Sequence, residues 1–252
     1  MGHIRLGNLP RTRKWQQVIE LLESGAATDQ IAAATLDASK RGLLDAARDP
    51  ALVHSFWLLT QLPLCARNSD YSAELKKIGI SVAGDPGLLD LVGAFSDSVD
   101  AHVNRTGGRT DLGEMAQMGA AESLTTTLRQ QTTSLFGTTP QDVQRELARL
   151  GSAKNFSLLA RDFFARLSER YLTYFLSRQL SSQYRNVEKN RQFREALALH
   201  CKQASKIVEA FAGGWYSKAN HEGGITQRKA ANFVQVALKK LRAELDKGAD
   251  GG

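Results

Sequence analysis

The 252-residue sequence has few cysteines and prolines, with only Cys65 and Cys201 of the first type and five of the second. Two cysteines cannot form the disulfide framework of a small secreted domain. Both lie in apolar helical patterns, where a free thiol packs as a small hydrophobic group. No apolar run approaches the ~18 residues of a membrane span, and the N-terminus lacks the apolar stretch of a secretory signal. We therefore expect reduced thiols, no membrane span and a cytoplasmic protein.

The sequence also lacks the short motifs of common catalytic and cofactor sites, such as GxxxxGKS/T, GxGxxG after a strand, HExxH, GxSxG and CxxC. Its five histidines and two cysteines are too scattered to supply the four ligands of a zinc site. These absences favour a protein that is not an enzyme and has neither cofactor nor metal. The strongest catalytic candidate is His221 with Glu222, because an imidazole and a carboxylate in a loop can perform acid–base chemistry. The alternative interpretation is a solvated turn between helices.

What the sequence does contain is apolar residues at helical spacing, as in Leu159, Phe163 and Leu167. Only Ile78, Ile80 and Val82 alternate as in a strand. We predict an all-α fold of about nine or ten helices. Three long C-terminal helices, over 152–183, 187–212 and 226–246, are expected to pack against shorter N-terminal helices.

Local signals mark several helix ends. Asp49-Pro50, Asp85-Pro86 and Thr139-Pro140 each place a capping residue before a proline at the first helical position. Thr226 is the expected cap of the last helix, and Gly213 is expected to end the one before it, followed by a glycine-rich linker over 213–224. Since no linker is long enough to separate two units, we predict one helical domain over 1–252, with a soft boundary near 105–110 and a frayed tail over 247–252.

The net charge of +7 is unevenly distributed. Residues 49–100 contain three basic and seven acidic side chains, whereas residues 151–252 contain 18 basic and nine acidic ones and 12 of the 18 aromatic side chains. A basic, aromatic-rich C-terminal region favours docking of a protein partner, or of a second copy of the chain. We therefore interpret the protein as a non-enzymatic interaction or accessory protein. Its candidate contact residues are Tyr184, Trp215 and Tyr216.

A nucleic-acid-binding protein is the alternative, because clustered cations also bind phosphates. Within residues 18–45, the stretch LLESGAATDQIA resembles the opening of a helix-turn-helix of the resolvase and invertase type. That resemblance implies that Ser39, Lys40 and Arg41 lie at the start of a recognition helix. An ordinary helix pair and a solvated amphipathic face remain the simpler interpretations. The other candidate phosphate contacts are Arg185, Arg191, Arg228, Lys229, Lys239 and Lys240, with Arg242 on the same helix.

Overall fold

The computed structural model describes residues 11–27, 30–31, 33–35, 37–39, 46–131, 139–183 and 187–249. Over these ranges the chain forms helices without any β-strand, so the all-α prediction is confirmed. The described residues contain eleven helices, slightly more than the expected nine or ten. They are α1 (Arg13–Glu23), the 3₁₀ helix η1 (Ala46–Arg48), α3 (Pro50–Cys65), α4 (Tyr71–Lys77), α5 (Leu88–Thr106), α6 (Asp111–Gln131), α7 (Pro140–Leu150), α8 (Ala153–Gln183), α9 (Val187–Ala204), α10 (Lys206–His221) and α11 (Gln227–Ala249).

Helix starts follow the local signals in the sequence. The Asp49 carboxylate accepts hydrogen bonds from the N–H groups of Ala51 and Leu52, at 2.9 and 3.0 Å, and so caps α3. Thr139 caps α7 in a reciprocal capping box. The Thr226 hydroxyl accepts from the N–H of Lys229 at 3.2 Å at the start of α11. These three predicted caps are confirmed. The cap predicted at Asp85 is wrong, because α5 begins at Leu88 after Gly87 and has no side-chain cap.

The predicted helix over 187–212 is wrong, because the structure divides this stretch between two helices. Helix α9 ends at Ala204, and α10 begins at Lys206 and continues through Gly213 to His221. Gly213 therefore does not end a helix. It lies inside α10 where that helix meets the start of α8, and a Cβ at this position would lie 2.9 Å from the carbonyl carbon of Ala153. The glycine serves a close approach of two backbones, and the linker predicted over 213–224 is mostly helix.

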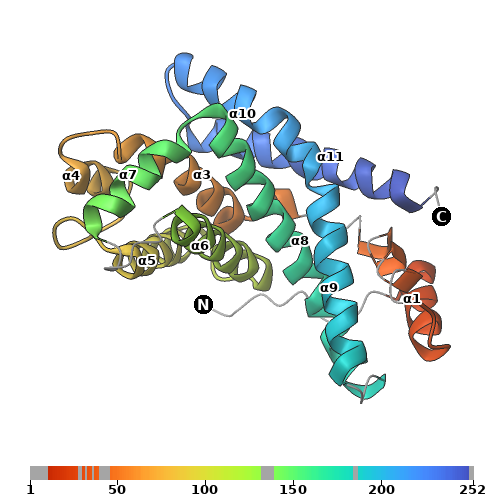
Figure 1. The fold of residues 1–252 in the computed structure, drawn as a ribbon. Helices are drawn as coiled ribbons and strands as arrows, with labels where there is room; N and C mark the ends of the chain where they lie inside the picture. Colours follow the sequence, from red (N-terminus) through yellow and green to blue (C-terminus); the bar gives the residue numbers. More distant parts are fainter. Residues whose placement is uncertain are drawn as a thin grey trace.

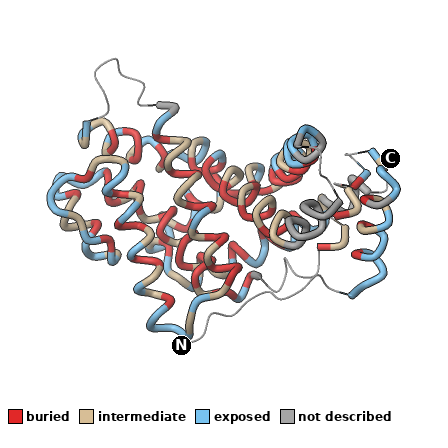
Figure 2. Tube along the Cα trace, turned by 90° about the horizontal axis from the view of Figure 1, so that it is seen from below, coloured by how far each residue is buried: buried red, intermediate tan, exposed pale blue. Residues whose placement is uncertain are grey.

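The core lies between α3, α8, α10 and α11 (Figure 1). Its centre is Phe56 of α3, whose ring stacks on Phe233 of α11 with centroids 4.9 Å apart and contacts Phe163 and Phe164 of α8. Helices α6 and α9 pack on α8, and α5 and α7 pack on α3. Figure 2 shows buried positions facing one another between the helices and exposed positions along their outer sides. Much of the aromatic enrichment of the C-terminal region therefore serves the core.

The sequence singled out two further places in the chain. Helices α5 and α6 flank the soft boundary near 105–110, and they pack against each other and against α3. The backbone of α11 is helical to Ala249, and residues 250–252 lie outside the described ranges. No helix in the described part of the chain combines the length and apolarity that crossing a membrane requires.

Candidate functional site

Helix α11 carries the most one-sided charge among the described helices, and side chains of α3 fix where this helix begins. The carbonyl oxygen of Ile225 accepts hydrogen bonds from Trp57 Nε1 at 2.9 Å and from Gln61 Nε2 at 3.1 Å. Two residues later, Gln227 Nε2 lies 2.7 Å from His54 Nδ1. The start of α11 is therefore attached to α3 by three polar contacts.

The histidine in that attachment is buried. His54 is 5% exposed, and its ring stacks on His102 of α5 with centroids 4.0 Å apart and planes 3° from parallel. Burial, and then the nearby charges of His102 and Arg105, lower the pKa of His54 to about 3. The imidazole is therefore neutral at pH 7. If the Gln227 amide donates to Nδ1, the ring proton lies on Nε2.

Lys229 closes the turn between α10 and α11. Its Nζ donates to the carbonyl oxygens of Ala219 at 3.2 Å, Glu222 at 2.9 Å and Gly224 at 2.8 Å. The last carbonyls of a helix have no partner within the helix, and a cation near them also favours the helix dipole. Lys229, which the sequence suggested as a phosphate contact, therefore uses its ammonium group for hydrogen bonds within the turn.

Four other basic residues of α11 are exposed, namely Arg228, Lys239, Lys240 and Arg242. Because α-helices turn once every 3.6 residues, Arg228, Asn232, Gln235, Lys239 and Arg242 form one stripe along the helix, which we call the α11 face. All five are exposed, and none is acidic. Within the described part of the chain, its three cations make no ion pair or side-chain hydrogen bond. Among the described side chains, nothing therefore compensates the positive charge of the α11 face.

Two neighbouring residues extend this surface. Lys240 is exposed, and its Nζ lies 5.4 Å from the centre of the Phe211 ring of α10, in a cation–π contact. Val236 is 43% exposed between Lys240 and the stripe. The surface next to the cations is therefore partly apolar.

Several other C-terminal cations pair with carboxylates. Arg161 of α8 pairs with Glu209 of α10 at 2.6 Å. Arg191, one of the predicted phosphate contacts, lies 2.5 Å from Glu188 and 2.6 Å from Glu195 on its own helix. These paired arginines contrast with Arg228, Lys239 and Arg242 of α11, which lie together on one stripe without an ion pair in the described residues.

The aromatic candidates belong to the interior. Tyr216 is 1% exposed, stacks on Phe156 with centroids 4.0 Å apart, and donates from its hydroxyl to the carbonyl of Thr60 at 3.3 Å. Burial raises its pKa to about 12. Trp215 is half-buried and packs on Phe233 with centroids 4.3 Å apart. These two side chains hold α10 on the core, and Tyr184 and Arg185 lie outside the described residues.

The helix-turn-helix candidate is only partly covered. Ser39 is 2% exposed, which turns it away from solvent, and Lys40 and Arg41 lie outside the described residues. The nearby Lys14 of α1 lies 2.8 Å from the carboxylate of Asp37. In this segment, Ser39 is therefore an interior residue, and Asp37 pairs with Lys14 of α1.

His221 and Glu222 are exposed at the end of α10. The Glu222 carboxylate lies 3.8 Å from Lys218 Nζ, and the His221 imidazole makes no hydrogen bond, ion pair or ring contact with the described residues. Within those residues, no acid–base partner is hydrogen-bonded to this histidine.

Both cysteines are free and buried. Burial raises the pKa of Cys65 to about 11 and also raises the pKa of the Cys201 thiol, so both remain protonated at neutral pH. The described part of the chain contains no group of three or more His, Cys, Asp and Glu side chains placed to hold a metal ion.

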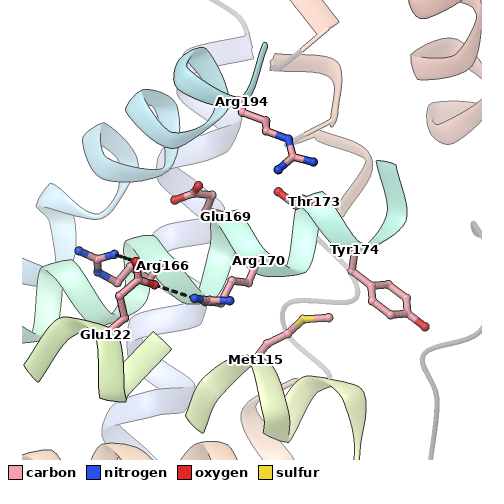
Figure 3. A pocket seen from close by; sticks show the side chains of 8 residues that line it. All are labelled: Met115, Glu122, Arg166, Glu169, Arg170, Thr173, Tyr174 and Arg194. Carbon is pink, nitrogen blue, oxygen red and sulfur yellow. Dashed lines mark hydrogen bonds and ion pairs between the residues drawn. The ribbon is translucent and has the colours of Figure 1, made fainter. Parts of the chain in front are cut away.

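One feature has no local signal in the sequence: a pocket of about 440 Å³ between α6, α8 and α9 (Figure 3). Its charged residues are separated by up to 72 positions, since Glu122 lies on α6 and Arg194 on α9. The sequence shows the arginines only as part of a basic run, and folding places carboxylates among them. The lining residues are Met115, Glu122, Arg166, Glu169, Arg170, Thr173, Tyr174 and Arg194.

Comparisons with protein-family models, curated proteins and solved structures find no match for this chain.

Proposed function

We propose that the protein is a non-enzymatic interaction protein that docks an acidic protein partner through the α11 face. The observation that carries this proposal is the row of Arg228, Lys239 and Arg242, exposed on one stripe with no carboxylate from position 228 to position 242. An acidic partner would supply the missing counter-charges and would be steered to the surface by them. The free thiols of Cys65 and Cys201 fit a reducing compartment such as the cytoplasm.

The composition of the surface favours a protein over a nucleic acid. Polar Asn232 and Gln235 separate the cations along the stripe, and the exposed Val236 adds an apolar contact. Single-stranded nucleic acids bind largely by stacking bases on exposed aromatic rings. Tyr216 is buried and Trp215 is packed into the core, so neither ring supports that mode.

Self-association would use the acidic segment of a second copy. Helices α4 and α5 belong to the acidic residues 49–100, and they lie at the opposite end of the molecule from the C-terminal end of α11 (Figure 1). A second copy would therefore have to bring its far end to the α11 face, in a ring or an open chain of copies or in an antiparallel pair. A separate acidic protein needs no such arrangement of copies.

The test compares three forms of the tagged protein purified from its native host, with and without nuclease treatment. They are the wild type, a Lys239→Glu/Arg242→Glu variant and a Lys76→Glu/Lys154→Glu control. The control changes the net charge by the same amount at exposed lysines of α4 and α8. Any protein recovered is then purified and titrated against each form.

The proposal predicts an acidic protein that survives nuclease treatment and binds the wild type and the control alike. Reversing Lys239 and Arg242 is expected to weaken its binding about tenfold or more at low salt, with a smaller effect at high salt. Loss of the partner on nuclease treatment, equal binding by both double variants, or recovery of this chain alone as a concentration-dependent oligomer would each overturn the proposal.

A further inference from the structure

We infer that the pocket between α6, α8 and α9 binds a small molecule through a tetrahedral, doubly charged oxyanion such as a phosphate ester. At about 440 Å³ the pocket falls within the size range of small-molecule sites. It is separate from the α11 face, and the inference does not depend on the proposed docking function.

Arg170 of α8 is the guanidinium with unused bonding capacity. Its Nη2 lies 2.6 Å from Glu122 Oε2, whereas the one hydrogen-bond acceptor of Nη1 among the described residues is the thioether sulfur of Met118 at 4.0 Å. Nε is buried without an acceptor within the described residues. A thioether is a weak acceptor, whereas an oxyanion makes short, charge-assisted bonds to guanidinium groups. An oxyanion is therefore the better partner for the Nη1 side of Arg170.

The neighbouring Arg166 is already satisfied. Its guanidinium bonds to Asp162 at 2.7 Å, to Glu122 at 2.6 Å and to the Thr126 hydroxyl at 3.2 Å. Because the two oxygens of Glu122 are divided between Arg166 and Arg170, that carboxylate offers each arginine a single oxygen. Glu122 therefore orients Arg170 without filling its donor groups.

The second cation comes from the other wall. Figure 3 shows Arg194 extending from α9 over Thr173, with Arg170 below on the far side of the hollow and Glu169 beside them. An oxyanion placed between Arg170 and Arg194 would meet two guanidinium groups and the Thr173 hydroxyl. Two cations and a neutral donor match a doubly charged tetrahedral group better than a singly charged one.

Glu169 makes the expected binding depend on pH. It faces Glu122 of α6, Arg166 and Arg170 of its own helix, and Arg194 of α9. Its carboxyl group forms no hydrogen bond with the described residues. Burial, and then the charge of Glu122, raise its pKa above the ordinary value against the opposing effect of the arginines.

The neighbouring Cys201 adds no negative charge beside Glu169 at neutral pH, because its thiol stays protonated. When ionised, Glu169 repels an incoming oxyanion, and when protonated it can donate a hydrogen bond to it. Oxyanion binding should therefore strengthen as the pH falls.

The probe is inorganic sulfate, which remains a dianion from pH 5 to 8 and so reports the protein's titration alone. The dissociation constant is measured by NMR, from the arginine side-chain N–H signals of the full chain, with ionic strength held constant by chloride. Acetate is the second probe and represents a carboxylate ligand. Thermal melts of every variant check that it is folded.

Two variants are expected to change affinity in opposite directions. Arg194→Gln, at an exposed position of α9, should weaken sulfate binding about tenfold. Glu169→Gln should tighten it severalfold at pH 7 and remove most of its dependence on pH. Arg191→Gln is the control, since Arg191 lies on the same helix as Arg194 but outside the pocket, and it should leave affinity unchanged.

Several results would overturn the inference. They are an absence of saturable sulfate binding, equal losses in Arg191→Gln and Arg194→Gln (an adventitious ion only), and weaker binding in folded Glu169→Gln. Acetate binding more tightly than sulfate would reassign the pocket to a carboxylate ligand and so contradict the tetrahedral assignment.

Discussion

The two adjacent glycines of α10, Gly213 and Gly214, should respond differently to replacement by alanine. The change at Gly214 should stabilise the fold, and the change at Gly213 should not. At Gly214, which is exposed, an added Cβ would meet no atom within 4 Å. Alanine is favoured over glycine inside a helix by about 1 kcal/mol. Gly214→Ala should therefore raise the free energy of unfolding by roughly that amount.

At Gly213 the same Cβ would lie 2.9 Å from the carbonyl carbon of Ala153, 3.3 Å from its Cα, and still closer to its carbonyl oxygen. These are backbone atoms at the start of α8 and cannot rotate away, so α8 and α10 must separate. Overpacking of this kind costs about 1–3 kcal/mol or more, against a helix-propensity gain of about 1 kcal/mol. Since the propensity gain is common to both variants, we expect Gly213→Ala to be less stable than Gly214→Ala by the overpacking cost, about 1–3 kcal/mol.

Urea unfolding followed by circular dichroism measures both variants against the wild type. A near-ultraviolet spectrum provides a second measurement, because Trp215 packs in the aromatic cluster beside Gly213. Gly213→Ala should change that spectrum, and Gly214→Ala should not. Equal stability of the two variants would refute the close approach of α8 and α10 and the reasoning built on it.

Two further predictions concern the attachment of α11. Since the folded-state pKa of His54 is lowered to about 3, its stabilising contribution is present above pH 6.5 and lost as the pH falls toward 3. The loss should be about 2 kcal/mol between pH 7 and pH 5, and His54→Gln should remove it from the pH profile of unfolding, unlike His221→Gln at an exposed site. Lys229→Met should destabilise the fold by about 1–2 kcal/mol in urea unfolding, because three carbonyls lose a charged donor. Lys239→Met, at an exposed site, should change it by less than about 0.5 kcal/mol.

Two results would contradict these predictions. One is a profile in which wild type and His54→Gln lose stability equally between pH 7 and pH 5. The other is equal stability of the two lysine variants, which would mean that the three carbonyl contacts of Lys229 contribute nothing measurable.

Local signals explain the parts of the fold that the sequence predicts well. The caps at Asp49, Thr139 and Thr226 act within three residues of themselves, so their effect can be judged without knowing the fold. The basic stripe of α11 is visible for the same reason, because its residues share one helix.

Contacts between distant residues explain what the sequence does not show. In the sequence, Gly213 is the residue type that commonly ends a helix. Only the close approach of Ala153, 60 positions earlier, shows why a glycine lies inside this helix. Tyr216, a candidate contact residue in the sequence, is buried against Phe156 of α8. The pocket depends on Glu122 reaching arginines of α8, which no spacing along the chain predicts.

The most direct test of the α11 face places a photo-crosslinking residue at its centre. Gln235→p-benzoylphenylalanine is introduced at an exposed site among the cations, with Lys76→p-benzoylphenylalanine on α4 as the matched control. After irradiation in the native host, adducts are identified by mass spectrometry with and without nuclease treatment. We predict a nuclease-resistant adduct to an acidic protein from position 235 and not from position 76. Adducts only to nucleic acid, only to a second copy of this chain, or equally from both positions would contradict the account.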